Sequence, residues 1–198
     1  MRYIWGNTTL GLKYYTNIND ASLSDQLRQA SIKTDNCLMD FYVSSWQDFP
    51  DIGRITGAYI IFYQGGPIYH GKHVPGPVAK SSTESEYNVA CTAGMSLEHL
   101  RILTHEFLNK YPDIVPEEAP LIFLDSKSDI CMAKNGKDTK HTRHISKRMH
   151  FIINGEKCKL HKIDWCEGGL QLAYIATKNI GETDLTSKMK YILIILDN

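Results

Sequence analysis

Apolar residues recur with two different periods along the chain, and the change of period separates expected strands from expected helices. Runs rich in aromatic and β-branched residues predict three consecutive strands at Cys37–Trp46, Gly57–Tyr63 and Ile68–Val74. The segment Asp48–Arg54 contains proline and glycine and is typical of a loop. A Gln-Gly-Gly-Pro turn at 64–67 should join the second and third runs into a hairpin.

A long helix should follow these strands. Apolar and small residues from Tyr87 to Phe107 recur at spacings of three and four, which predicts one buried helical stripe. Ser82 or Thr83 is the expected N-cap, and prolines at 112 and 116 should end the helix. The short apolar run Leu121–Leu124 is typical of a strand buried on both faces of a sheet.

The rest of the chain alternates between helical and extended patterns. We expect helices at Ser128–Lys134, His141–Asn154 and Leu170–Lys178, with a strand at Lys157–Asp164 between the last two. The order of elements is three strands, a helix, a strand, helices, a strand and a helix. This order predicts an α/β fold with a mixed five-stranded sheet, three antiparallel strands and then parallel ones, with helices on its faces.

Before these elements, residues 10–15 form a further strand candidate, and the polar segment Asn17–Asn36 is typical of a connector with a weak helical stretch at Leu23–Ala30. The composition adds little to this picture. Apolar residues make up 42% of the 198 positions, and 22 basic residues balance 22 acidic ones. The sequence shows no signal peptide and no apolar run long enough to span a membrane. The five cysteines are scattered, which favours reduced thiols and a cytoplasmic or nuclear protein.

Six motifs, in one order, resemble the ribonuclease H domain of copia-type LTR retrotransposon Pol polyproteins. The resemblance covers almost the whole chain and implies a ribonuclease H-like fold at 36–180, a connector at 1–35 that follows the reverse transcriptase region, and a C-terminal tail at 181–198. The motifs are the helix start SSTESEY at 81–87, LDSKS at 124–128, KHTRHI at 140–145 continuing to MHFI at 149–152, LAYIATK at 172–178, RITGAY at 54–59, and MRYIWG with LGL at 1–12.

The resemblance implies a magnesium-dependent hydrolase that cleaves the RNA strand of RNA–DNA hybrids. In such enzymes four acids hold two metal ions about 4 Å apart. Glu86 and Asp125 match two of the four positions and are the expected catalytic residues and metal ligands. Valine and tyrosine stand at the other two, as Val43 and Tyr174. Asp40, three residues before Val43, should point to the opposite face of its strand and so cannot replace the missing acid.

Each matching acid also has an ordinary structural interpretation. Glu86 could be a solvated acid in the first turn of a helix, and Asp125 could start a loop or cap a helix. The motif context favours the site. With two acids replaced, we expect cleavage to be impaired or absent. Two alternatives remain: an inactive domain that binds nucleic acid or completes a polyprotein, and a decaying genomic fragment without present function.

A basic stretch in the second half of the chain is the expected contact with RNA–DNA hybrid or duplex. The alternative is a solvated helix face, which is the usual explanation of such a charge run. His141 and His144 stand three residues apart, but no further ligand lies at a matching offset for zinc. Besides nucleic acid, the reverse transcriptase region of the same polyprotein is an expected partner. The candidate nucleic-acid-binding residues are Lys140, His141, Arg143, His144, Lys147 and Arg148.

Overall fold

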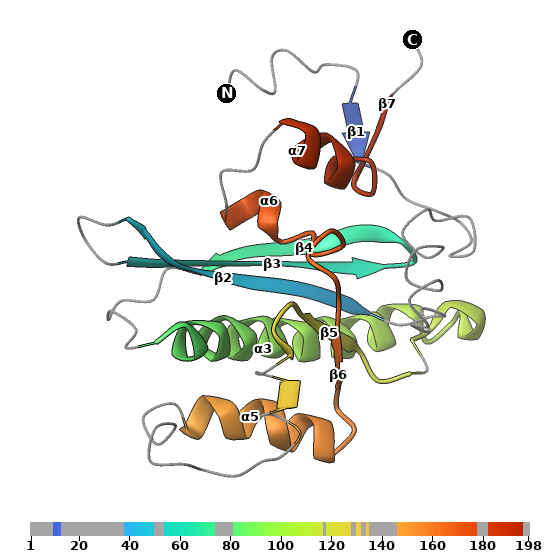
Figure 1. The fold of residues 1–198 in the computed structure, drawn as a ribbon. Coiled ribbons are helices and arrows are strands. Elements are labelled where there is room, and N and C mark those ends of the chain that lie inside the picture. Colours follow the sequence, from blue (N-terminus) through green and yellow to red (C-terminus); the bar gives the residue numbers. More distant parts are fainter. Residues whose placement is uncertain are drawn as a thin grey trace.

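The structure is a computed structural model that describes residues 10–12, 38–49, 54–73, 81–116, 118–127, 130–131, 134, 146–177 and 182–195. Figure 1 shows its elements as a sheet between helices. The strands are β1 (Leu10–Leu12), β2 (Met39–Phe49), β3 (Arg54–Tyr63), β4 (Gly66–His73), β5 (Leu121–Leu124), β6 (Lys162–Trp165) and β7 (Leu193–Ile195). The helices are α3 (Ser82–Leu108), the 3-10 helix η2 (Pro112–Ile114), α5 (Ser146–Lys157), α6 (Tyr174–Thr177) and α7 (Glu182–Met189).

The central sheet has five strands in the order β4-β3-β2-β5-β6. β2, β3 and β4 pair antiparallel, whereas β5 is parallel to both β2 and β6. Gln64 and Gly65 have φ angles of 50° and 74°, the left-handed conformation that a tight hairpin turn between β3 and β4 requires. The predicted mixed sheet of three antiparallel strands followed by parallel ones is confirmed.

Two apolar cores form because side chains alternate along the strands. Leu38 and Tyr42 pack under α3 and α5 on one face of the sheet. Met39, Phe41 and Val43 lie on the other face, against the segment that leads into α6. Figure 1 shows α3 and α5 on one side of the sheet, with α6 and α7 on the other. β2 is the central strand and contributes to both cores.

Helix α3 packs closely on the sheet because a glycine lies beneath it. A Cβ atom on Gly57 of β3 would approach Cγ2 of Val89 to 2.0 Å, so any larger residue would push the helix away. The helix starts one or two residues earlier than expected: Ser81 is the N-cap, and its side chain accepts a hydrogen bond from the backbone N–H of Glu84 at 3.1 Å. The N-cap prediction at Ser82 or Thr83 was therefore wrong by one or two positions.

The C-terminal third departs further from the predicted boundaries. The strand expected from Lys157 begins only at Lys162, because α5 continues to Lys157 and ends in a turn through Lys159, whose φ is 58°. The helix expected at Leu170–Lys178 is a single α-helical turn, α6. Residues 181–198 include α7 and β7, and β7 pairs antiparallel with β1. The predicted helical stretch Leu23–Ala30 lies outside the described residues.

Among the helices that the structure describes, none combines the length and the apolar character needed to cross a bilayer.

Candidate functional site

Two parallel strands bring the first two candidate positions to the same level of the sheet. The last paired residues of β2 and β5 are Phe41 and Phe123. Val43 and Asp125 each follow two residues later, and alternation keeps them on the face of Phe41 and Phe123. Asp125 is partly buried, whereas Val43 is completely buried in the apolar core of that face.

Glu86 of α3 reaches the same end of strand β2. Both of its carboxylate oxygens accept from the backbone N–H of Ser44, at 3.3 Å and 3.2 Å. The neighbouring residue Ser85 is fully buried and shares a hydrogen bond with the hydroxyl of Ser44. The first turn of α3 is therefore fixed to β2 at the residue after Val43, and the close approach over Gly57 makes this possible.

Tyr174 supplies the fourth candidate position, at the start of α6. Its hydroxyl donates a hydrogen bond to Oδ2 of Asp125 over 2.5 Å. A phenol bonded to a carboxylate at this distance forms a charge-assisted hydrogen bond, which is stronger than one between neutral groups. The buried Gln171 holds the preceding turn against β5 by donating to the carbonyl of Phe123 at 3.3 Å. Fold and hydrogen bonds thus gather Val43, Glu86, Asp125 and Tyr174.

Electrostatics keep the Tyr174 phenol neutral. Burial raises its pKa well above the ordinary value, and the hydrogen bond to Asp125 and the charges of Asp125 and Glu86 raise it further. Burial likewise raises the pKa of the Cys166 thiol to about 12, with the charge of Asp125 as a smaller cause. Neither group becomes an anion near neutral pH, so neither adds negative charge to the site.

A buried cation lies beside the phenol. Lys188 of α7 is only 4% exposed and donates to the carbonyls of Gly168 and Gly169 at 2.8 Å and 2.7 Å. Its ammonium nitrogen lies 5.4 Å from the centroid of the Tyr174 ring, within cation–π range. Helix α7 therefore helps to fix the turn that carries Tyr174. Lys188 could not be singled out from the sequence, because a lysine in a polar helix is usually solvated.

The gathered side chains do not suit a pair of divalent cations. Glu86 and Asp125 offer two carboxylates, and each already accepts a hydrogen bond from the protein. Within the described part of the chain, no group of three or more His, Cys, Asp or Glu residues is placed to hold a metal ion. Two magnesium ions carry four positive charges, and oxygen anions are their preferred ligands. Two acids leave much of that charge uncompensated.

Asp40 lies on the opposite face of β2, as the alternation predicted. It pairs in register with Ile61 and Ile122, both members of the core under α3. Its carboxylate is fully buried and makes no hydrogen bond to any residue that the structure describes, and burial raises its pKa well above the ordinary value. Asp40 therefore contributes no charge to the site.

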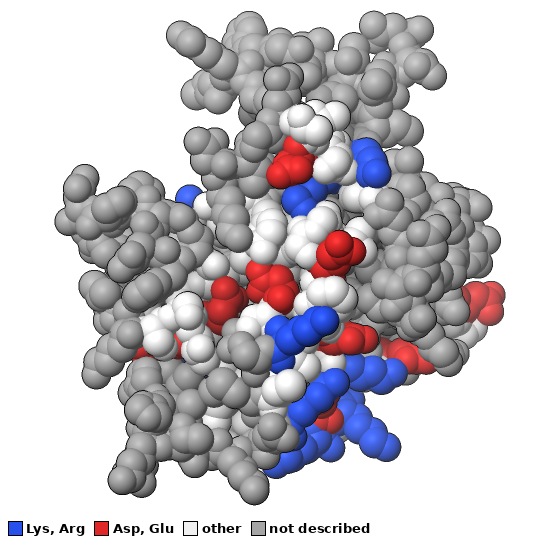
Figure 2. All heavy atoms as spheres, in the orientation of Figure 1, with Lys and Arg blue, Asp and Glu red and all other residues white. Residues whose placement is uncertain are grey.

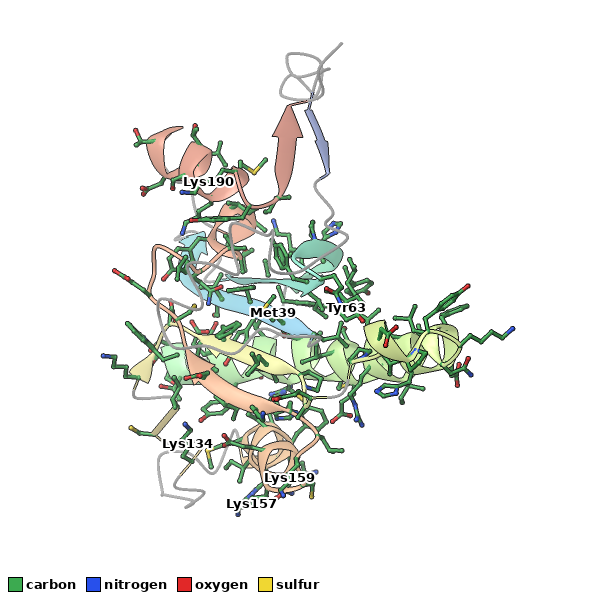
Figure 3. The ribbon with its side chains drawn as sticks, turned by 90° about the vertical axis from the view of Figure 1, so that its right-hand side faces the viewer. Met39, Tyr63, Lys134, Lys157, Lys159 and Lys190 are labelled. Carbon is green, nitrogen blue, oxygen red and sulfur yellow. The ribbon has the colours of Figure 1, made fainter. Side chains whose placement is uncertain are left out.

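Exposed basic side chains gather beyond the acidic residues, over α5, β6 and the segment after β5 (Figure 2). Lys147 and Arg148 belong to the predicted nucleic-acid contact and are exposed on α5, whereas Lys140, His141, Arg143 and His144 lie outside the described residues. Figure 3 shows Lys134, Lys157 and Lys159 near the same end of the molecule. We call the following exposed residues the basic surface: Lys127, Lys134, Lys147, Arg148, Lys157, Lys159 and Lys162.

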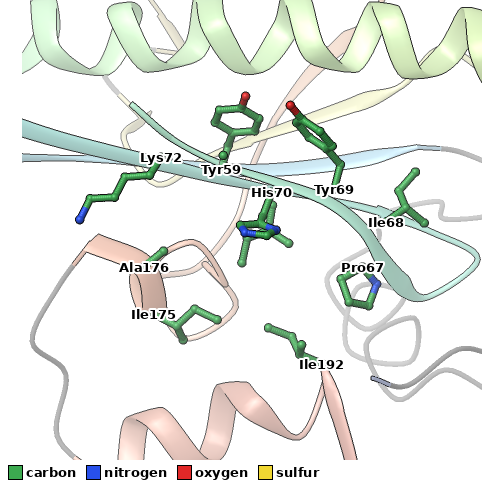
Figure 4. A pocket seen from close by; sticks show the side chains of 11 residues that line it. Tyr59, Pro67, Ile68, Tyr69, His70, Lys72, Ile175, Ala176 and Ile192 are labelled. Atoms are coloured by element: carbon green, nitrogen blue, oxygen red, sulfur yellow. The ribbon is translucent and has the colours of Figure 1, made fainter. Parts of the chain in front are cut away.

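A separate cavity of about 470 Å³ lies against the edge strand β4. Figure 4 shows Ile175, Ala176 and Ile192 facing His70 and Lys72 of β4 across it. No carboxylate is among its described lining residues, so it offers no ligands for a hard cation. The candidate metal-binding carboxylates, Glu86 and Asp125, therefore lie at a different place from this cavity.

Comparison with known proteins places part of the chain among retroelement sequences. No protein-family model matches it. It is 28% identical over 116 residues to the retrovirus-related Pol polyprotein from transposon TNT 1-94 of Nicotiana tabacum. The match covers 57% of this chain and spans 8% of the polyprotein's length. The predicted relationship to retrotransposon Pol polyproteins is confirmed.

Several solved ribonuclease H structures are similar in outline. LC11-RNase H1, isolated from compost, has a TM-score of 0.47 at 11% identity, covering 79% of this chain and 93% of its own. Its complex with RNA/DNA hybrid has a TM-score of 0.49 at 9% identity, covering 68% and 88%. RNase H1 from Halobacterium salinarum has a TM-score of 0.46 at 11% identity, covering 72% and 94%. The fold assignment rests on the strand order and directions described above.

Proposed function

We propose that this chain, a relative of retrotransposon Pol polyproteins, is a ribonuclease H-like domain that binds RNA–DNA hybrid and cleaves it little or not at all. The observation that carries the proposal is the hydrogen bond from Tyr174 to Asp125. A neutral donor stands where the family resemblance implies a carboxylate. A metal-dependent enzyme of this kind needs a ligand at the position of Tyr174 that attracts a cation. The phenol instead donates a hydrogen bond to the neighbouring carboxylate of Asp125.

The buried Val43 supports the same conclusion. Its side chain is 0% exposed and packs in the apolar core, so it leaves neither an oxygen ligand nor space for a hydrated ion there. Magnesium is the cofactor that the resemblance implies, and Glu86 and Asp125 are the carboxylates that would coordinate it. Because these two do not compensate a pair of ions, we assign no metal-dependent cleavage step to this chain.

Binding is the part of the function that we propose is retained. Exposed cations on the basic surface can contact phosphates and release counterions, which makes affinity fall as salt rises. Lys147 and Arg148, with Lys140, His141, Arg143 and His144, remain the proposed contacts. Such a substrate would be met in the cytoplasm or the nucleus. The proposed division is a connector at 1–35, the ribonuclease H-like domain at 36–180 and a C-terminal tail at 181–198, with reverse transcriptase as the neighbouring region.

The proposal is tested by measuring binding and cleavage on one preparation. We expect a fluorescent hybrid to bind with an affinity that falls steeply between about 50 mM and about 200 mM salt. Replacing Lys147 and Arg148 by alanine should reduce the salt slope by about two counterions. The amount of cleaved hybrid should stay at background in buffers that contain magnesium or manganese. Turnover like that of a four-acid relative would refute the loss of cleavage, and absence of binding at low salt would favour the scaffold or decayed-fragment alternative.

A further inference from the structure

An exposed tryptophan contacts both Asp125, which with Glu86 forms the acid pair of the candidate site, and Lys127 of the basic surface. Trp165 ends β6 and is 38% exposed, although tryptophan is usually well buried. Its register partner is Leu124, the residue immediately before Asp125. Leu124 packs in the core under α3, so Trp165 lies on that face of the sheet, at the end of β5 where the turn with Asp125 begins.

The indole is held in a fixed orientation. Its Nε1–H donates to the backbone carbonyl of Asp125 at 3.3 Å, which ties the ring to the turn after β5. The ammonium nitrogen of Lys127 lies 4.3 Å from the ring centroid. Because cation–π contact needs the ring face, the Lys127 charge sits over the aromatic surface and not at its edge.

We propose that Trp165 and Lys127 form a binding site for an unpaired nucleotide of a nucleic-acid strand that runs past the acid pair. A base can stack on the indole, and Lys127 can move from the ring to the adjoining phosphate. Proteins that hold single strands combine these two elements, an aromatic platform and a positive track along the backbone. Within the described residues, Lys127 of the basic surface lies over the indole, and Lys162 begins the short strand that Trp165 ends.

This inference rests on the proposed function and extends it, because it names the kind of nucleic-acid strand, an unpaired one, that the site prefers. In a paired hybrid the bases are stacked on one another and their faces are unavailable to the indole. A hybrid with a single-stranded overhang offers both the duplex phosphates and a free base. We therefore expect the overhang to add affinity, and this gain should depend on Trp165.

The test is fluorescence anisotropy with three probes: a blunt hybrid, the same hybrid with a single-stranded overhang, and the single strand alone. The full chain should bind the overhang probe about tenfold tighter than the blunt one, the gain expected for stacking of one base. Trp165→Ala should abolish this difference and leave blunt-hybrid affinity nearly unchanged. Trp165→Phe should keep most of it, and Lys127→Ala should reduce the salt slope for the single strand by about 0.7.

Tyr111→Ala is the matched control, because Tyr111 is an exposed aromatic residue (62%) that follows the far end of α3. It should leave all three affinities unchanged. A second readout is the tryptophan fluorescence. Adding the single strand should quench the fluorescence of the wild-type full chain more than that of the Trp165→Phe variant. Equal affinities for blunt and overhang probes, or an overhang preference that survives Trp165→Ala, would refute this site while the proposed hybrid binding stands. Absence of binding to every probe would refute both proposals.

Discussion

The hydroxyl of Tyr174 lies 2.5 Å from Oδ2 of Asp125 and donates a hydrogen bond to it. Tyr174 comes from α6 on one face of the sheet, and Asp125 from the end of β5. The bond satisfies a carboxylate that would otherwise attract a cation. The resemblance implies metal-binding acids at both of these positions. The two side chains that stand there are instead hydrogen-bonded directly to each other.

This bond predicts the effect of removing one oxygen atom. Tyr174→Phe deletes the donor and adds no ligand, so Asp125 becomes free to attract a cation beside Glu86. We expect terbium or manganese to bind at least about tenfold tighter, which corresponds to the loss of one competing hydrogen bond to a charged group, worth about 1.5 kcal/mol or more. Luminescence or electron paramagnetic resonance titration measures it.

Tyr69→Phe serves as the control for the loss of a phenol, because Tyr69 lies on the edge strand β4 and is 45% exposed. It should leave the cation affinity unchanged. Equal or weaker binding by Tyr174→Phe would show that the phenol does not compete for Asp125.

The contact between β3 and α3 gives a second prediction. Gly57→Ala places a methyl group against Val89, so it should destabilise the protein by about 1–3 kcal/mol, the usual cost of overpacking. It should also shift the first turn of α3 and lengthen the bond from Ser44 to Glu86. Thermal or urea unfolding measures the first effect.

The compensating change is Val89→Ala, which removes Cγ2 and Cγ1, at 2.0 Å and 3.1 Å from the new methyl group, and leaves Cβ at 3.1 Å. The double variant should be more stable than the sum of the two single effects predicts, a favourable coupling in a double-mutant cycle. Strict additivity would contradict close packing of Gly57 under Val89.

Part of this architecture could be predicted from sequence because two periodicities were strong. The apolar run Leu121–Leu124 matches β5, and the stripe from Tyr87 to Phe107 matches α3 within a few residues. The boundary between α5 and β6 was missed. The residues Lys157–Leu160 fit the pattern of a strand no better than that of a helix end. The residue with a left-handed backbone in this turn is Lys159, so no glycine marked the turn in the sequence.

Two lysines of the C-terminal segment should behave differently although they are two residues apart. Lys188 is buried and bonded to two carbonyls, so Lys188→Met should lower the free energy of unfolding by about 2 kcal/mol, because hydrogen bonds to a charged group are lost. Lys190 is exposed, with its ammonium 4.8 Å from the ring of Tyr191. Lys190→Met should cost at most about 0.5 kcal/mol, a typical surface substitution. Similar losses from both variants in urea unfolding would refute the bonded role of Lys188.

Asp40 predicts a pH dependence of stability. Its folded-state pKa is raised by burial, whereas the unfolded chain ionises near its ordinary pKa of about 3.9. As pH rises above that value the unfolded state loses its proton first, so the free energy of unfolding should fall until the folded pKa is reached. Each pH unit in this window costs about 1.4 kcal/mol.

Asp40→Asn removes this titration and should give a flatter profile. The difference between wild type and Asp40→Asn, measured by urea unfolding from about pH 4 to pH 8, isolates Asp40 from the buried His161. The pKa of His161 is lowered by burial, so its contribution is lost as pH falls. A difference that does not change with pH would mean that Asp40 ionises normally.

The candidate site could be outlined from sequence only where motifs name residue types. Glu86, Asp125, Val43 and Tyr174 followed from the resemblance, and the sheet register brings them to one edge. Their partners could not be found this way. A serine backbone N–H, a buried lysine on α7 and an indole at the end of β6 carry no motif, since their role depends on how distant segments pack.

In our proposal, Val43 and Tyr174 are the two residues that prevent cleavage. The most direct measurement compares the wild-type chain with Val43→Asp/Tyr174→Asp for hydrolysis of a labelled RNA–DNA hybrid in magnesium. We predict background cleavage by the wild type and magnesium-dependent cleavage by the double variant, whose new carboxylates should also make its stability depend on magnesium. Cleavage by the wild type at a rate equal to that of the double variant would contradict the claim.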